Sequence, residues 1–238
     1  MSSTETVLVT GASRGIGRAI CGQLLALGYQ VIGLARHFDQ ADLELPGFVP
    51  VSVDLARLQE LPNHLIHLLQ KYPDICAVIS NAGMGRFAHL EEFSVEQIRE
   101  MVDINLTSHL VLARTLMPHL KSLRQSHLIL MGSEAGLQGG VKGAVYSACK
   151  AGLRAMAQSL RKEAARSGLH VSIINPGMVQ TEFYSGQAFS PGAGQLEHLQ
   201  TDDVANAVVM VLQARSGCNI DEINLSPLKK VIRHRSDP

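Results

Sequence analysis

The chain has 238 residues, 46% of them hydrophobic, and its 21 basic residues balance 21 acidic ones. This length suits one well-buried domain over residues 1–238, and the zero net charge excludes a generally basic surface for nucleic acid or an anionic membrane. The N-terminus lacks the features of a signal peptide, no apolar run approaches the ~18 residues of a membrane span, and no Cys-x-x-Cys pair occurs. We therefore expect a cytoplasmic protein without membrane or nucleic-acid partners.

Apolar strand patterns alternate with helical patterns along the whole chain. Such alternation is typical of βαβ units and predicts an α/β fold, a doubly wound parallel sheet of about seven strands with helices on both faces. One long helix is expected over 94–121, after a capping signal at Ser94 and Gln97, while the connection 36–47 looks too short for a full crossover helix. The expected strands are 6–10, 30–35, 48–54, 75–80, 127–132, 170–175 and 219–225.

A glycine-rich turn follows the first expected strand and leads into a helix over 18–27. Its residues are Gly11-Ala12-Ser13-Arg14-Gly15-Ile16-Gly17. Glycines permit close backbone approach, and the unpaired amides at a helix start favour a phosphate. The spacing differs from the usual Gly-x-Gly-x-x-Gly fingerprint, and no Gly-Lys-Ser/Thr follows, which argues against a nucleotide triphosphatase. On its own, such a turn also fits a plain tight connection.

Tyr146 and Lys150 lie four residues apart in an expected helix, with Ser133 thirteen residues before the tyrosine. Residues at this spacing share a helix face, so the ammonium group is expected beside the phenol. A free tyrosine titrates near pH ~10, and a neighbouring cation lowers that pKa by favouring the phenolate. The pair is therefore a candidate acid/base device, although an isolated Tyr-x-x-x-Lys pair also fits an ordinary helix surface.

Together these motifs resemble the short-chain dehydrogenase/reductase family, and the resemblance covers nearly the whole chain. It rests on a cofactor turn, a motif after the fourth strand, a catalytic tetrad and a segment that closes over a nicotinamide. In this sequence they are residues 10–17, Asn81-Ala82-Gly83, Asn105 with Ser133, Tyr146 and Lys150, and Pro176-Gly177 with Thr181. The resemblance implies a Rossmann-like fold and an NADP(H)-dependent enzyme of the carbonyl reductase type.

The implied cofactor-binding residues stand at or just after the ends of expected strands, and so converge on one sheet edge. An NAD site has an acidic side chain about 20 residues past the glycines, but here the second strand is followed by Arg36. Arg36 and Arg14 match the family's basic residues for NADP(H), although each also fits a solvated arginine, and Asp54 resembles the residue that contacts the adenine. The implied set is Gly11, Ser13, Arg14, Gly15, Ile16, Gly17, Arg36, Asp54, Leu55, Asn81, Ala82, Gly83, Tyr146, Lys150, Pro176, Gly177, Val179 and Thr181.

The resemblance also implies the catalytic roles. Ser133 hydrogen-bonds the substrate carbonyl oxygen, and Tyr146 delivers the proton that this oxygen needs as hydride arrives. Lys150 stabilises the tyrosinate and holds ribose hydroxyls, while Asn105 holds a water that links Lys150 to solvent. Asn105 also fits a simple polar helix position, and Ser133 fits a cap at the end of its strand.

The expected substrate is a small or medium carbonyl compound or alcohol. Residues 183–200 read as a flexible lid loop or a plain surface connection, and Glu134 and Arg86 are candidates for binding a charged substrate group. One alternative function is a 3-oxoacyl-thioester reductase that acts on acyl-carrier-protein. For that function, a basic C-terminal cluster would face the acidic carrier protein; without it, the cluster is expected to be a solvated tail. A second alternative function is a non-catalytic NADP(H)-binding regulator. The basic cluster is Lys229, Lys230, Arg233 and Arg235.

Family resemblance further implies a homodimer or homotetramer, assembled through the two long helices near 94–121 and 146–167. No metal site is expected, because His64 and His67 share a helix but nothing nearby completes a set of three or four ligands. The scattered histidines, His109 among them, are expected to be surface or partly buried polar residues.

Overall fold

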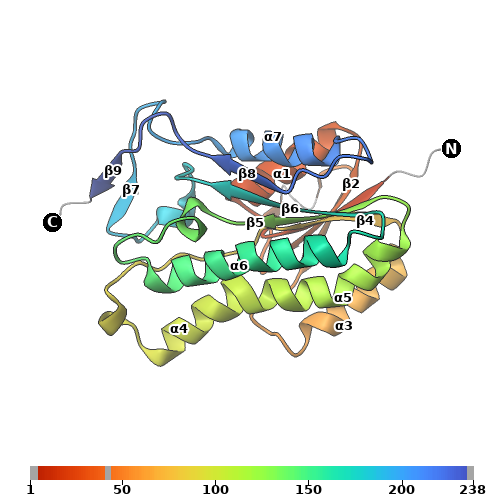
Figure 1. Cartoon of the computed structure of the whole chain (residues 1–238), viewed down its shortest axis with the longest axis horizontal. Helices are drawn as coiled ribbons and strands as arrows, with labels where there is room; N and C mark the ends of the chain where they lie inside the picture. The colour runs from red at the N-terminus through yellow and green to blue at the C-terminus, as the bar shows by residue number, and fades with distance from the viewer. Residues whose placement is uncertain (1–4, 41–43, 235–238) are drawn as a thin grey trace.

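A computed structural model describes residues 5–40 and 44–234, in which strands and helices alternate along the chain. Its parallel strands are β1 (Thr6–Thr10), β2 (Gln30–Ala35), β3 (Phe48–Ser52), β4 (Ile75–Ser80), β5 (Ser126–Met131), β6 (Leu169–Pro176) and β8 (Glu222–Leu225). They form one sheet in the order β3-β2-β1-β4-β5-β6-β8 (Figure 1). This is the single-domain, doubly wound, Rossmann-like fold that the alternation of strands and helices predicted.

Helices cover both faces of the sheet (Figure 1). One face carries α1 (Gly15–Ala26) and α7 (Thr201–Leu212), and the other carries α3 (Leu61–Lys71), α5 (Ser108–Ser122) and α6 (Ala144–Glu163). Parallel strands need such crossovers, because each strand must start again from the same edge of the sheet. Within residues 5–40 and 44–234, no helix combines the length and the apolar character needed to cross a membrane.

The side chains of β1 show why both helix layers are present. Leu8 packs into the core on the side of α3, α5 and α6, whereas Val7 and Val9 pack into the core on the side of α1 and α7. All three are fully buried. Successive residues of a strand point to opposite faces, so a continuous apolar strand is stable only where both faces are covered.

The bounds of β1, β2 and β4 are as predicted, but β8 begins at Glu222 rather than at residue 219. The side chain of Asn219 explains the difference. Its oxygen accepts the Val171 N–H (3.2 Å) and its amide donates to the Val171 carbonyl (3.0 Å). In a paired strand, backbone groups make such hydrogen bonds. Here the Asn219 side chain makes them instead, so the backbone pairing of β8 with β6 begins later than predicted.

The single helix expected over 94–121 is divided. It consists of α4 (Val95–Val102), a π-helical segment (Asp103–Thr107) and α5. The predicted start is confirmed, because the Ser94 hydroxyl accepts the Gln97 N–H (3.2 Å) and the Gln97 side chain accepts the Ser94 N–H (3.1 Å). The π-helical segment widens one turn around Asn105, whose side chain bonds outside the helix. Such local wide turns often occur at functional sites.

Two regions expected to be irregular contain a small second sheet. The strand β7 (Phe189–Pro191), inside the expected lid loop, pairs antiparallel with β9 (Ile232–His234), inside the expected C-terminal tail (Figure 1). The expected solvation is confirmed for Lys229, Lys230 and Arg233, which are exposed, but the segment forms a strand rather than an irregular tail, and Arg235 lies outside the described residues. In the connection 36–47, residues 41–43 are likewise not described, so the absence of a crossover helix there stays a prediction.

Candidate active site

The segments that follow β1 and β4, where the strand order reverses, are fastened to each other. The Thr10 hydroxyl accepts the backbone N–H groups of Asn81 (2.9 Å) and Ala82 (3.0 Å), and the Asn81 side-chain amide donates to the Thr10 carbonyl (2.9 Å). In doubly wound sheets, ligands bind in the crevice outside this point. The glycine turn and residues 81–83 are thus brought together at the position of a ligand crevice.

The turn between β1 and α1 forms a backbone cradle. Gly11 has a φ of 68° and Gly15 one of 55°, and a Cβ on Gly17 would collide with the carbonyl oxygen of Gly11. Ser13 and Ile16 lie in the same turn. The first N–H groups of α1 have no intrahelical partners, and the first turn carries no acidic residue. Free amides and the helix dipole attract a phosphate, so the cradle fits the pyrophosphate of a dinucleotide.

Arg14 and Arg36 border this cradle, and both are exposed. Arg36 directly follows β2, whose Leu34 carbonyl accepts the N–H of Gly11 (2.8 Å), so the end of β2 lies against the turn. A guanidinium nitrogen of Arg14 lies 3.6 Å from the Glu182 carboxylate in an exposed ion pair. Two cationic side chains therefore stand beside the place that the pyrophosphate fits.

Asp54 and Leu55 follow β3 at the same edge of the sheet. The pairing of β3 with β2 continues past its last residue, because the Val53 N–H donates to the Ala35 carbonyl (2.9 Å). A carboxylate oxygen of Asp54 accepts the Ala56 N–H (3.0 Å), which fixes the acidic group just beyond the strand. The carboxylate thus lies on the same side of the cradle as the end of β2.

Tyr146 and Lys150 lie one turn apart on α6, and both side chains are buried. Lys150 is 3% exposed, and its Nζ lies 5.8 Å from the centre of the Tyr146 ring. The same Nζ donates to the Met131 carbonyl at the end of β5 (2.8 Å). An ammonium group has three N–H donors, so it retains donors for further partners such as ribose hydroxyls.

Burial changes the acidity of both groups. Desolvation raises the pKa of Tyr146 to about 12, and a hydrogen bond with Ser133 acts in the opposite direction. Desolvation also lowers the pKa of Lys150 to about 8. The expectation that Lys150 holds the pKa of Tyr146 below its ordinary value was wrong for this structure, because removal of the phenol from water outweighs the other influences on it.

Ser133 stands at the end of β5, next to the phenol of Tyr146. Its hydroxyl oxygen accepts the Ala135 N–H (3.2 Å) at the start of a short helical turn, Glu134–Gly136. Ser133 therefore also caps this turn, which agrees with the alternative reading of Ser133 as a capping residue. The hydroxyl is nevertheless within hydrogen-bonding reach of Tyr146. A serine and a tyrosine hydroxyl therefore lie together where β5 ends.

Asn105 is fully buried in the π-helical segment and holds the loop after β4. Its oxygen accepts the Met84 N–H (3.0 Å), and its amide donates to the carbonyls of Met84 (2.9 Å) and Met101 (3.0 Å). A Cβ on Gly83 would lie 2.9 Å from the Asn105 oxygen and 3.7 Å from Lys150 Nζ, so both side chains flank this glycine. Both amide donors are occupied, and the side-chain oxygen, which already accepts the Met84 N–H, retains a second lone pair that can accept from a water.

His109 is a site residue that sequence reasoning missed. Expected at the surface or partly buried, it is 1% exposed and lies one turn beyond Asn105. Its Nε2–H donates to the Ala82 carbonyl (3.0 Å), so Nδ1 accepts the Ser80 hydroxyl (2.6 Å). Burial and then the Lys150 charge lower the pKa of His109 to about 3, which keeps the ring neutral. The sequence signal that could have identified His109 is its spacing of four residues from Asn105, which places both side chains on the same helix face.

The segment after β6 runs beside the glycine turn. Pro176 is the last residue of β6, and Gly177 N–H continues the pairing with the next strand. Val179 is buried, and a Cβ on Gly15 would lie 3.5 Å from a methyl group of Thr181. The predicted nicotinamide segment and the predicted phosphate turn are therefore neighbours.

The comparisons with known proteins agree with this geometry. A family model for short chain dehydrogenases matches residues 5–188. An uncharacterised oxidoreductase of Staphylococcus epidermidis is 31% identical over 229 residues, which cover 94% of this chain and 97% of the relative.

Solved structures show the same similarity. An alcohol dehydrogenase of the archaeon Thermococcus sibiricus, complexed with 5-hydroxy-NADP, has a TM-score of 0.86 and 25% identity, covering 96% of this chain and 99% of that one. The closed form of a serine dehydrogenase complexed with NADP+ has a TM-score of 0.80 and 25% identity, covering 92% and 94%. The sequence match, the parallel sheet and the phosphate cradle at its switch point agree, and the chain belongs to the short-chain dehydrogenase/reductase family of oxidoreductases.

Proposed function

We propose that the protein is an NADPH-dependent oxidoreductase that interconverts a small or medium carbonyl compound and its alcohol. The observation that carries the proposal is the arrangement of Tyr146, Lys150 and Ser133. These three polar side chains lie together at the same edge of the sheet as the backbone cradle for a pyrophosphate. A proton donor, a buried cation and a hydroxyl beside a dinucleotide cradle are the groups that carbonyl reduction needs.

The bound nicotinamide cofactor supplies the hydride, and the protein supplies the proton, so that a C=O group becomes CH–OH. The carbonyl oxygen gains negative charge during the reaction and needs hydrogen-bond donors. Ser133 donates one hydrogen bond to this oxygen, and Tyr146 donates the proton. The Tyr146 phenol is protonated at neutral pH and so has a proton to give, and because burial raises its pKa, release of that proton depends on the charge of Lys150.

Lys150 has two tasks in this proposal. Its ammonium group stabilises the tyrosinate that remains after proton transfer, and its unused donors hold the ribose hydroxyls of the cofactor. Asn105 acts through its side-chain oxygen, which lies beside Gly83 and would hold a water that returns a proton toward Lys150. The segment with Gly177, Val179 and Thr181 covers the nicotinamide end, and residues 183–200 act as a lid over the substrate.

Removal of the Tyr146 hydroxyl tests the catalytic proposal. Tyr146→Phe keeps the ring and its packing, so NADPH should still bind, with a fluorescence change close to that of the wild type. Turnover should fall at least ~10²-fold, the low end of general acid catalysis. Tyr72→Phe, at the end of α3, is the matched control and should retain turnover. Near wild-type turnover in Tyr146→Phe would remove the proposed mechanism.

We propose NADP(H) as the cofactor because Arg14 and Arg36 provide positive charge beside the cradle. Arginine suits the 2′-phosphate of NADP(H), whereas a carboxylate in this place suits the ribose hydroxyls of NAD(H). The Thermococcus sibiricus alcohol dehydrogenase and the serine dehydrogenase described above are complexed with an NADP derivative and with NADP+. These complexes support the assignment.

Cofactor preference tests this assignment. Wild type should favour NADPH over NADH by at least ~10-fold in kcat/KM, since a phosphate pairs with arginine through strong charged hydrogen bonds. Arg36→Asp should shift the preference toward NADH, whereas Arg57→Asp, which changes an exposed arginine paired with Glu60, should leave it unaltered. Equal KM values for the two cofactors in the wild type would contradict the assignment.

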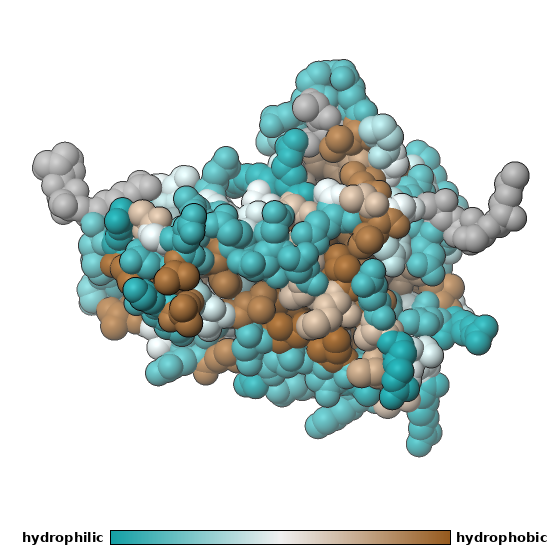
Figure 2. All heavy atoms as spheres, turned by 90° about the horizontal axis from the view of Figure 1, so that it is seen from above, coloured by the Kyte–Doolittle hydropathy of each residue, from teal (hydrophilic) through white to brown (hydrophobic). Residues whose placement is uncertain are grey.

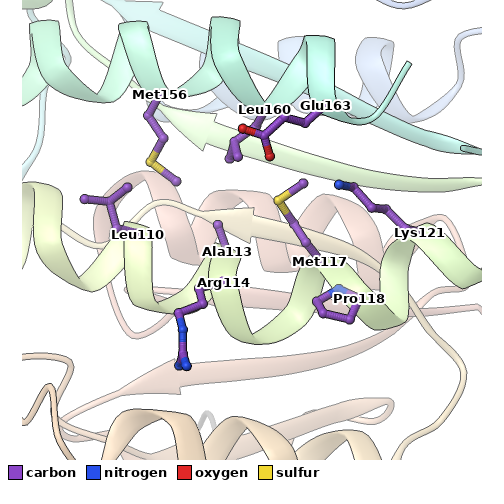
Figure 3. Close-up of a pocket in the computed structure, with 9 residues that line it drawn as sticks. All are labelled: Leu110, Ala113, Arg114, Met117, Pro118, Lys121, Met156, Leu160 and Glu163. Carbon is purple, nitrogen blue, oxygen red and sulfur yellow. The ribbon is translucent and has the colours of Figure 1, made fainter. Parts of the chain in front are cut away.

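We further propose that two copies of the chain associate through α5 and α6. A groove of about 550 Å³ lies between these helices, with apolar side chains along it and charged ones at its margins (Figure 3). The apolar lining makes the groove suited to burial against the same helices of a second copy. Its lining residues are Leu110, Ala113, Arg114, Met117, Pro118, Lys121, Met156, Leu160 and Glu163.

A charge placed on this face should weaken association. Leu110 on α5 is 46% exposed and Ile66 on α3 is 47% exposed, which makes them a matched pair. Leu110→Glu should shift the protein toward the monomer in size-exclusion chromatography with light scattering, because desolvation of a carboxylate at an apolar interface is costly even where Arg114, one turn on, pairs with it. Ile66→Glu should elute as the wild type does. A monomeric wild type would rule out the association.

A further inference from the structure

Aromatic side chains are scarce in this chain, yet they gather around Tyr146. The sequence has six phenylalanines, four tyrosines and no tryptophan. Half of these ten residues form one connected group, which we call the aromatic cluster: Phe87, Tyr146, Phe183, Tyr184 and Phe189. Such a concentration next to the proposed acid indicates the chemistry of the group that binds there.

The rings of the aromatic cluster contact one another in a closed series. The Phe87 and Phe183 ring centroids lie 5.4 Å and 5.8 Å from that of Tyr146. Phe189 lies 5.0 Å from Phe87 and 5.6 Å from Tyr184, which in turn lies 5.3 Å from Phe183. The interplanar angles are 55° to 80°, so the contacts are tilted or edge-on, the arrangements that aromatic rings favour.

The lid segment is held at two places, by the loop after β4 and by the C-terminal segment. The Gln187 side chain donates to the Gly85 carbonyl (2.9 Å), and β7, which contains Phe189, pairs with β9. Apolar side chains also reach the surface at the C-terminal end of the molecule (Figure 2), where Leu228 and Ile232 are exposed. The aromatic cluster is therefore held in place by contacts with other parts of the fold. The C-terminal segment adds exposed apolar side chains.

The charged side chains of this region are paired with each other. Lys230 lies 2.8 Å from the Glu134 carboxylate, and Arg86 lies 3.8 Å from that of Glu100. The expectation that Glu134 and Arg86 bind a charged substrate group stays a prediction, and these ion pairs count against it. Glu134 also directly follows Ser133, and its carboxylate would lie 3.1 Å from a Cβ on Gly177. A carboxylate at this place disfavours an anionic substrate.

We propose that the substrate is an uncharged ketone or aldehyde with an aryl group next to the carbonyl, bound against the exposed faces of the half-buried rings of Phe87, Phe183 and Phe189. This inference rests on the proposed function and names the substrate class of that same site. The rings offer flat apolar contact surfaces for the aryl group, while Tyr146 and Ser133 reach the carbonyl oxygen. A carboxylate group would have to leave water beside Glu134, and the nearby cations Lys230 and Arg86 are each paired with another carboxylate.

Three α-keto compounds separate the aryl group from the charge. Methyl benzoylformate is aryl and neutral, methyl pyruvate is alkyl and neutral, and benzoylformate is aryl and anionic. With NADPH, kcat/KM for methyl benzoylformate should exceed that for each of the other two by at least ~10-fold. Equal or faster reduction of methyl pyruvate or benzoylformate would overturn the inference.

A ring-deleting substitution tests the cluster itself. Phe183→Leu keeps an apolar side chain but removes the ring, so the ratio of kcat/KM for methyl benzoylformate to that for methyl pyruvate should fall at least ~3-fold. Tyr72→Leu removes a ring far from the site and should leave this ratio unaltered. An unaltered ratio in Phe183→Leu would show that the cluster does not select the aryl group.

Binding without turnover distinguishes the inference from the proposed function. The alcohol product, methyl mandelate, can be titrated calorimetrically into the wild-type protein in the presence of NADP+, with lactate methyl ester as the alkyl comparison. Preferential binding of methyl mandelate together with no reduction of any carbonyl would overturn the proposed function and support the aryl site. Reduction of other carbonyls together with no binding of methyl mandelate would overturn the inference alone.

Discussion

The buried ammonium group of Lys150 is the constraint on which the arrangement of the site depends. A charge that is 3% exposed is costly unless it is hydrogen-bonded, and here it bonds the Met131 carbonyl at the end of β5. The same group lies beside the Tyr146 ring and next to Gly83. The end of β5, the start of α6 and the turn after β4 must therefore be correctly placed together for the charge to be tolerated.

Hydrogen bonds from outside the turn after β4 hold it in that place. Thr10 accepts the N–H groups of Asn81 and Ala82, His109 donates to the Ala82 carbonyl, and the Asn105 side chain bonds both the N–H and the carbonyl of Met84. His109 does this as a neutral ring, because its burial near Lys150 opposes a second positive charge. Five backbone groups of the turn thus have protein partners, which holds the backbone in place where the proposed cofactor meets the proposed acid.

Much of this could be predicted from the sequence, where the signal is local. Apolar runs gave the bounds of β1, β2 and β4, and the glycines and the Tyr-x-x-x-Lys spacing placed the cradle and the buried pair. The rest depends on contacts between distant segments that leave no periodic pattern: the π-helical segment around Asn105, the Asn219 side chain that replaces strand bonds, and the pairing of β7 with β9. The acidity of Tyr146 was also beyond sequence reasoning, because spacing reports a nearby cation but not how much water the fold removes.

The central claim is that the buried charge of Lys150 makes Tyr146 a usable acid once the cofactor is bound. A spectroscopic titration of tyrosinate, taken as the difference between wild type and Tyr146→Phe, measures the pKa of this one phenol. Without cofactor it should titrate near pH 12, since burial raises its pKa. With saturating NADP+ the midpoint should fall by roughly two pH units or more: ribose hydroxyls that accept hydrogen bonds from Lys150 keep its amine, whose pKa burial lowers to about 8, protonated, and the oxidised nicotinamide adds positive charge. A midpoint that is the same with and without NADP+ would contradict the account.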